Sequence, residues 1–84
     1  MQADIVVLAA LEEEIEYAKS ASGLHWVTKP SPPFSTRSYD FARTANGLVV
    51  AACHASQMGQ IHAAVLTADV LRDLRPRLVV LLGI

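Results

Sequence analysis

Three consecutive carboxylates follow a short apolar segment near the start of the chain, and one of them could do acid–base chemistry. The apolar run Ile5–Leu8 is followed, after Leu11, by the triplet Glu12–Glu14. At the carboxyl end of a strand in an open α/β sheet, a carboxylate could act as a general base or hold a water molecule. Alternatively, acidic residues in a first helical turn only stabilise the helix dipole.

At most one glutamate of this triplet can face a given pocket. Successive residues of a helix point about 100° apart, so neighbouring side chains diverge. Glu13 and Glu16 are expected to be solvated, whereas Glu14 could turn inward. Glu14 is therefore the candidate for chemistry at this strand end.

A second candidate site precedes the second helical segment, in the stretch "ASQMGQ". Ser56 and Gly59 are small, and the backbone amides at the start of a helix are free to bind ribose hydroxyls or an anion. The alternative is a simple N-cap serine with a permissive glycine. The residues alone do not choose between these interpretations.

The remaining reactive residue types do not form a site in the sequence. Cys53 and His54 are adjacent in a predicted strand, so they point to opposite faces and cannot pair as nucleophile and base. His25, His54 and His62 lack metal-ligand spacing, so no metal is expected. No cofactor is expected either.

The first half of the chain reads as a strand, a helix and an antiparallel pair. A buried strand is predicted at Ile5–Leu8 and a helix from about Glu12 to Ser20, with Gly23 as its stop. Leu24–Thr28 could be a strand, before an exposed loop rich in proline. Alternation in "SYDFART" then predicts a half-exposed strand with Tyr39 and Phe41 on one face, and the turn signal at 45–47 leads into a strand at 48–53.

The second half repeats the strand–helix pattern. The helical segment is predicted to end before Pro76 and to place one set of apolar residues on its core face: Ile61, Ala64, Val65, Ala68 and Leu71. Leu78–Leu82 is predicted to be a strand buried on both faces, which ordinarily leads to a turn and a covering helix. We therefore expect residues 1–84 to be the N-terminal part of one larger α/β domain.

Composition bounds the function. The hydrophobic fraction of 52% is high for 84 residues, which indicates apolar surface meant for a partner. Net charge is −1, so the basic face of a nucleic-acid-binding protein is missing. The single cysteine favours a reducing, cytoplasmic compartment. The longest apolar run is far shorter than the ~20 residues that span a bilayer, so no membrane partner is expected.

Two motifs, in this order, resemble the methylthioadenosine/S-adenosylhomocysteine nucleosidases of the nucleoside phosphorylase-like superfamily. "IVVLAALEEEIEYA" is similar to their first strand and helix, which ordinarily read as an apolar strand, Gly-Ala-Met and three glutamates. "SQMGQIHAAVLTADVLRDLRPRLVVLLGI" is similar to their Ser-Gly-Ile-Gly-Lys-Val helix and following strand. The resemblance implies a three-layer domain with a mixed central sheet flanked by helices.

The resemblance also implies roles for individual residues. Glu14 matches the glutamate that orders and activates the attacking water, and Leu11 replaces a methionine that lines the ribose site. Ser56 matches a serine beside the nucleophile, and Gly59 keeps the backbone close there. The family's ribose-binding glutamate and base-protonating aspartate lie beyond Ile84, so these 84 residues are not expected to be a complete catalyst.

The implied reaction is hydrolysis of the N-glycosidic bond of a purine nucleoside or nucleotide, in a protein that is commonly a homo-oligomer. A phosphate-dependent phosphorylase of the same fold is a rival, although a carboxylate cluster would repel phosphate and favour water. A non-catalytic domain for nucleoside binding or oligomer contact is a second rival. A small binding module that folds alone is the third.

Overall fold

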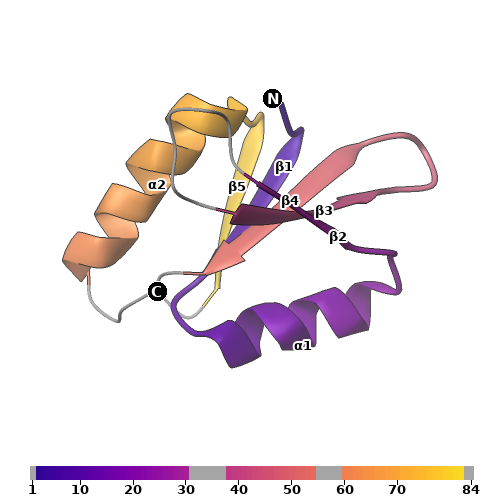
Figure 1. Ribbon diagram of the computed structural model, residues 1–84, viewed down its shortest axis with the longest axis horizontal. Helices are drawn as coiled ribbons and strands as arrows, with labels where there is room; N and C mark the ends of the chain where they lie inside the picture. The colour runs from indigo at the N-terminus through magenta and orange to yellow at the C-terminus, as the bar shows by residue number, and fades with distance from the viewer. Residues whose placement is uncertain (1, 31–37, 55–59, 83–84) are drawn as a thin grey trace.

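The computed structural model describes residues 2–30, 38–54 and 60–82, with the side chains at 30, 38, 60–64 and 66 excepted. Within these ranges the chain forms one five-stranded sheet and two helices (Figure 1). The elements follow one another as β1 (Ile5–Ala9), α1 (Glu12–Ser22), β2 (Val27–Pro30), β3 (Ser38–Arg43), β4 (Val49–His54), α2 (Gln60–Leu74) and β5 (Leu78–Leu82). The predicted α/β class is confirmed.

The sheet is mixed, with strand order β2-β3-β4-β1-β5. β1 lies between β4 and β5 and is parallel to both, whereas β2, β3 and β4 pair antiparallel. The predicted turn at 45–47 joins β3 to β4. There the Gly47 amide donates to the Thr44 carbonyl at 3.0 Å, and Gly47 has a φ of 88° that suits glycine.

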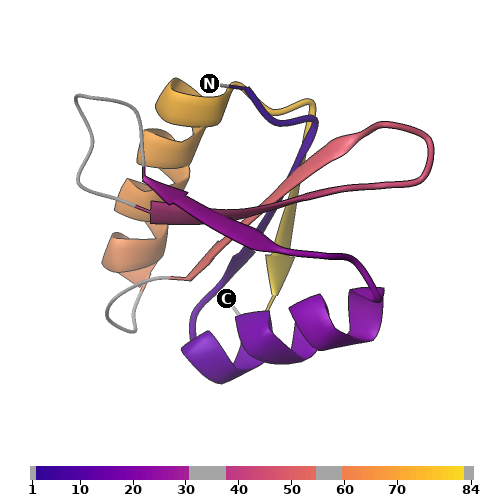
Figure 2. The same ribbon diagram turned by 45° about the vertical axis from the view of Figure 1, so that its right-hand side comes forward.

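The two helices cover opposite faces of the sheet (Figure 2). Val6 and Leu8 of β1 point to the face on which α2 packs through Val70 and Leu74. The alternate residue Ala9 points to the other face, where it contacts Ile15 of α1. Because both faces of β1 are covered, the strand is continuously apolar rather than alternating.

The ends of α1 follow from local chemistry. The helix begins after Leu11, which is extended (φ −122°, ψ 148°), and the triplet of glutamates occupies its first turn. It ends at Ser22 because Gly23 takes a left-handed conformation with φ 69°. The Ser22 hydroxyl donates to the Lys19 carbonyl and accepts from the Trp26 indole nitrogen at 3.1 Å. The predicted stop at Gly23 is confirmed.

The predicted core face of α2 is wrong where the structure describes it. Val65 and Leu71 are 51% and 48% exposed, whereas Val70 and Leu74 are fully buried. The helix carries apolar residues on more than one side, so its periodicity does not select a single face. A hydrogen bond also fits this orientation of α2 about its own axis, since the buried Tyr39 hydroxyl of β3 donates to Asp73 of the helix at 2.9 Å.

β5 was predicted to be buried on both faces, and this is also wrong. Leu78 and Leu81 are 54% and 52% exposed because β5 is an edge strand of the described sheet.

At the opposite edge, β2 begins at Val27 rather than at Leu24 and extends to Pro30, where a loop was predicted. Proline is tolerated at this position because an edge strand leaves backbone groups unpaired. The remainder of the predicted loop lies outside the described residues.

Candidate functional site

The carboxyl ends of the parallel strands meet at one edge of the sheet. Ala9 at the end of β1 pairs with His54 at the end of β4 and with Leu82 at the end of β5. α1 begins immediately beyond this edge, so Leu11 and Glu14 lie at the place where open α/β sheets bind ligands. The fold therefore brings two of the predicted site residues to a suitable edge.

Glu14 is oriented by the backbone of its own helix start. Its Oε1 accepts a hydrogen bond from the Leu11 amide at 3.1 Å. Glu14 is half-buried, whereas Glu12 and Glu13 are exposed, so the three neighbouring side chains differ in their exposure. The structure also gives Glu14 a capping role at the helix start, where backbone amides lack intrahelical partners. No described side chain donates to its second oxygen, Oε2.

Leu11 is accessible at the same edge, with 38% of its surface exposed. Its side chain could contact a ligand held near Glu14, as the resemblance implies for the ribose site. Ser56 and Gly59, the other two predicted binding residues, lie outside the described residues. The site is therefore described only on the β1–α1 side.

His54 is a candidate that the sequence did not select. It ends β4 directly beside Ala9, and its buried Nδ1 has no hydrogen-bond partner in the described part of the chain. A buried nitrogen without a partner is costly, which makes it a natural acceptor or donor for a ligand hydroxyl. Cys53 packs against the α2-side core, so the expectation that the pair cannot act as nucleophile and base is supported by the geometry. The sequence feature that could have identified His54 is its position at the end of a predicted strand.

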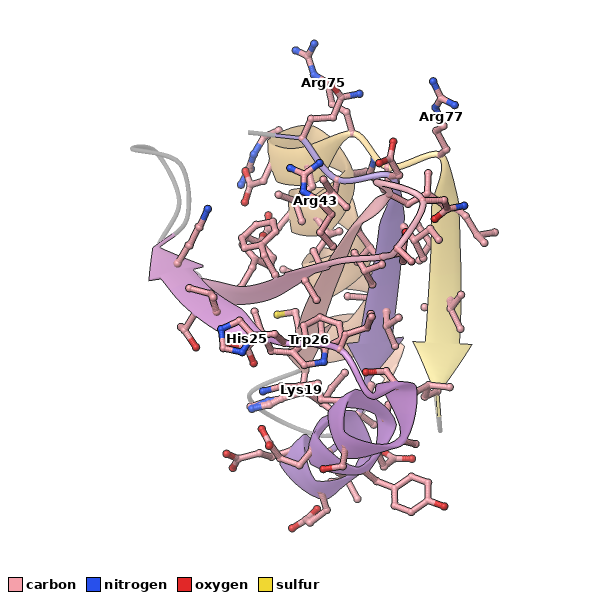
Figure 3. The ribbon with its side chains drawn as sticks, turned by 90° about the vertical axis from the view of Figure 1, so that its right-hand side faces the viewer. Lys19, His25, Trp26, Arg43, Arg75 and Arg77 are labelled. Carbon is pink, nitrogen blue, oxygen red and sulfur yellow. The ribbon has the colours of Figure 1, made fainter. Side chains whose placement is uncertain are left out.

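A polar cluster beneath α1 was also missed. Lys19 Nζ lies 2.6 Å from Asp40 Oδ2, and the Thr28 hydroxyl donates to Asp40 Oδ1 at 2.5 Å. Figure 3 shows Lys19 on the side of α1 that faces the sheet. The alternation of Tyr39 and Phe41 toward one face was the available signal, because it places Asp40 on the other.

The electrostatics of this cluster stabilise both charges. The hydrogen bond to Asp40 raises the pKa of Lys19 above its ordinary value of 10.5, against the opposing effect of burial. Burial pulls the pKa of Asp40 upward, but hydrogen bonds from Lys19 and Thr28 outweigh it and hold that pKa below 3.8. The charge of His54 lowers the Asp40 pKa further. The cluster ties α1 to β3 and so sets the position of the helix that carries Glu14.

The described residues hold no group of three or more His, Cys, Asp and Glu side chains arranged for a metal ion. In the same ranges, neither helix combines the length and apolar character needed to cross a membrane. Comparisons with protein-family models, curated proteins and solved structures found no match for this chain.

Proposed function

We propose that this chain forms part of a nucleosidase site that hydrolyses the N-glycosidic bond of a purine nucleoside or nucleotide. The observation that carries the proposal is the place and orientation of Glu14. It lies just beyond the carboxyl end of β1, with one carboxylate oxygen held by the Leu11 amide. The motif resemblance assigns the water-activating role to this residue.

In the proposed mechanism Glu14 orients the attacking water. The bond from the Leu11 amide restricts the carboxylate, and Oε2 accepts a proton from water. The oxygen of that water attacks the anomeric carbon as the glycosidic bond breaks and the purine leaves protonated. Leu11 packs against the sugar, and the unpartnered Nδ1 of His54 is available to a ligand hydroxyl. In this mechanism the remaining ribose contacts and the proton for the base come from groups other than Glu14, Leu11 and His54.

The wider proposal is a nucleoside phosphorylase-like domain of three layers in a cytoplasmic homo-oligomer. Helices on both faces of a mixed sheet are compatible with that architecture. Exposed apolar side chains on α2 and β5 supply surface that a further layer or subunit would cover: Val65, Leu71, Leu78 and Leu81.

A non-catalytic nucleoside-binding domain is the second candidate. The Glu14–Leu11 bond favours it, because capping alone would account for the carboxylate. A binding domain would retain nucleoside without releasing its base. Phosphorolysis is the third, and only its dependence on phosphate distinguishes it from hydrolysis.

The experiment is free-base release by the longest encoded form of the protein. Methylthioadenosine, S-adenosylhomocysteine, adenosine and ATP would each be supplied with and without phosphate. We expect base without phosphate, abolished by Glu14→Gln and retained by Glu13→Gln, since Glu13 is exposed in the same turn. Equal loss in both variants would contradict the role of Glu14. Release of base only in the presence of phosphate would indicate a phosphorylase. Binding of nucleoside without release of its base would indicate a sensing domain.

A further inference from the structure

A hollow of about 330 Å³ lies on the β2–β3 pair, away from the β1–β4 edge that carries Glu14. It is lined by His25, Val27, Lys29, Phe41, Ala42 and Arg43. Val27 pairs with Phe41 and Lys29 pairs with Tyr39, so their side chains share the face on which α2 packs. His25 lies two residues before the start of β2, and Arg43 is the last residue of β3.

The hollow has a cationic rim and an apolar floor. His25, Lys29 and Arg43 are exposed, while Phe41 is 9% exposed and Val27 is 45% exposed. Lys29 Nζ stands 5.9 Å from the centre of the Phe41 ring. Lys29 and Arg43 bring two formal positive charges to one cavity in a chain with a net charge of −1, and the imidazole of His25 also lines it.

No carboxylate in the described ranges neutralises this rim. Asp40, the acidic residue of β3, points to the other face and bonds to Lys19 and Thr28. Arg43 donates to the Gly47 carbonyl at 3.3 Å, and no carboxylate of the described residues forms an ion pair with it. A lysine on an edge strand can serve merely to prevent strand pairing. That explanation covers Lys29 but not Arg43, which belongs to the inner strand β3.

We propose that this hollow binds a small organic anion that carries a phosphate or carboxylate group on an apolar ring. The anionic group takes the cationic rim, and the ring lies against Val27. Pockets that bind small molecules share this combination of an apolar lining with a few convergent polar groups, and the cavity lies at the small end of their ~300–1,000 Å³ range. The proposal is independent of the nucleosidase site, since β2 contributes nothing to the sheet edge at Glu14.

The test is a titration of the isotopically labelled full chain with phenyl phosphate, followed by amide chemical shifts. Inorganic phosphate and phenol supply the two halves of the probe. We expect shifts concentrated at residues 25–29 and 41–43, with phenyl phosphate binding at least about fivefold more tightly than either half. Lys29→Ala and Arg43→Ala should each lower the affinity for phenyl phosphate by about fivefold or more.

Arg77→Ala is the matched control. It removes the same charge from an exposed arginine, and Figure 3 shows Arg77 at the end of the molecule opposite α1. We expect the affinity of this variant to equal that of the parent chain. Because Lys29 and Arg43 are exposed, their variants should keep the parent pattern of distant amide shifts, which verifies folding in the same spectra. Absence of shifts on β2 and β3, equal weakening by Arg77→Ala, or equal binding of phosphate and phenyl phosphate would each overturn the proposal.

Discussion

The two helices lie on opposite faces of one sheet but are held in different ways. α1 buries only Ile15 and is positioned by polar bonds, namely the Lys19–Asp40 pair and the caps at Glu14 and Gly23. α2 buries Val70 and Leu74 in the main core. The helix that starts at the candidate site is therefore the one with less apolar anchoring. Elements near functional sites are commonly drawn from the less stable parts of a fold.

Removing apolar anchoring from α2 should have the largest effect. Leu74→Ala deletes a fully buried side chain and should lower the free energy of unfolding by about 2–5 kcal/mol. Leu71→Ala, one turn earlier and 48% exposed, is the matched control and should cost below about 1 kcal/mol. Urea denaturation of both variants measures the difference. Equal losses would contradict the difference in burial between the two leucines.

Breaking the polar anchor of α1 should have an intermediate effect. Lys19→Met leaves the Asp40 carboxylate partly buried without its cation, and should cost about 1–3 kcal/mol at neutral pH. Glu16→Gln is the control, because Glu16 contacts the same lysine at 3.2 Å but is 59% exposed. It should cost below about 0.5 kcal/mol. If Glu16→Gln lowered the free energy of unfolding more than Lys19→Met, the exposed Lys19–Glu16 pair rather than the Lys19–Asp40 pair would anchor α1.

The same pair predicts a pH dependence of folding. The pKa of Asp40 is lowered on folding, so its contribution is present above 3.8 and is lost as pH falls through the folded value. The pKa of Lys19 is raised, so its contribution is present below 10.5 and is lost as pH rises through the folded value. The stability gap between parent and Lys19→Met should therefore be flat near neutrality and shrink at both extremes. A gap that is unchanged below pH 3.8 would contradict this assignment.

The C-terminal cap of α1 should contribute less. Gly23→Ala forces a side chain into a left-handed conformation and should cost about 1 kcal/mol. A Cβ at this position would meet nothing within 4 Å, so the loss is conformational rather than steric. Gly23→Asn is the control, because asparagine tolerates this conformation and should lose less. Thermal unfolding of the two variants separates them, and equal losses would refute the conformational explanation.

Glu14→Gln should change stability least. The amide oxygen still accepts from the Leu11 amide, so only the interaction of the charge with the helix dipole is lost, at about 0.3–1 kcal/mol. Glu14→Ala also removes the acceptor and should cost about 0.5–2 kcal/mol. Denaturation of the pair tests whether the capping bond forms in solution. If glutamine is as destabilising as alanine, the charge rather than the hydrogen bond supports the helix start.

Local patterns predicted the elements of this chain more successfully than their environments. The run Ile5–Leu8 and the alternation of Tyr39 with Phe41 indicated strands correctly, and Gly23 marked a helix end, because these signals depend on neighbouring residues. The face of α2 and the burial of β5 were predicted wrongly. Both depend on which surfaces other parts of the chain cover, and a helix with apolar residues on several sides does not specify this.

The candidate site likewise has features that the sequence predicted and contacts that only the folded structure shows. The order of Leu11 and Glu14 after an apolar strand indicated the sheet edge, since a strand followed by a helix needs little more than local chemistry. The contacts of Asp40 with Lys19, of Tyr39 with Asp73, and of Ala9 with His54 join residues far apart in the chain. Only folding brings such groups together, because their spacing along the sequence carries no information about strand order. The amino-acid order thus determined the strands, helix ends and candidate carboxylate, and the tertiary packing decided which side chains surround them.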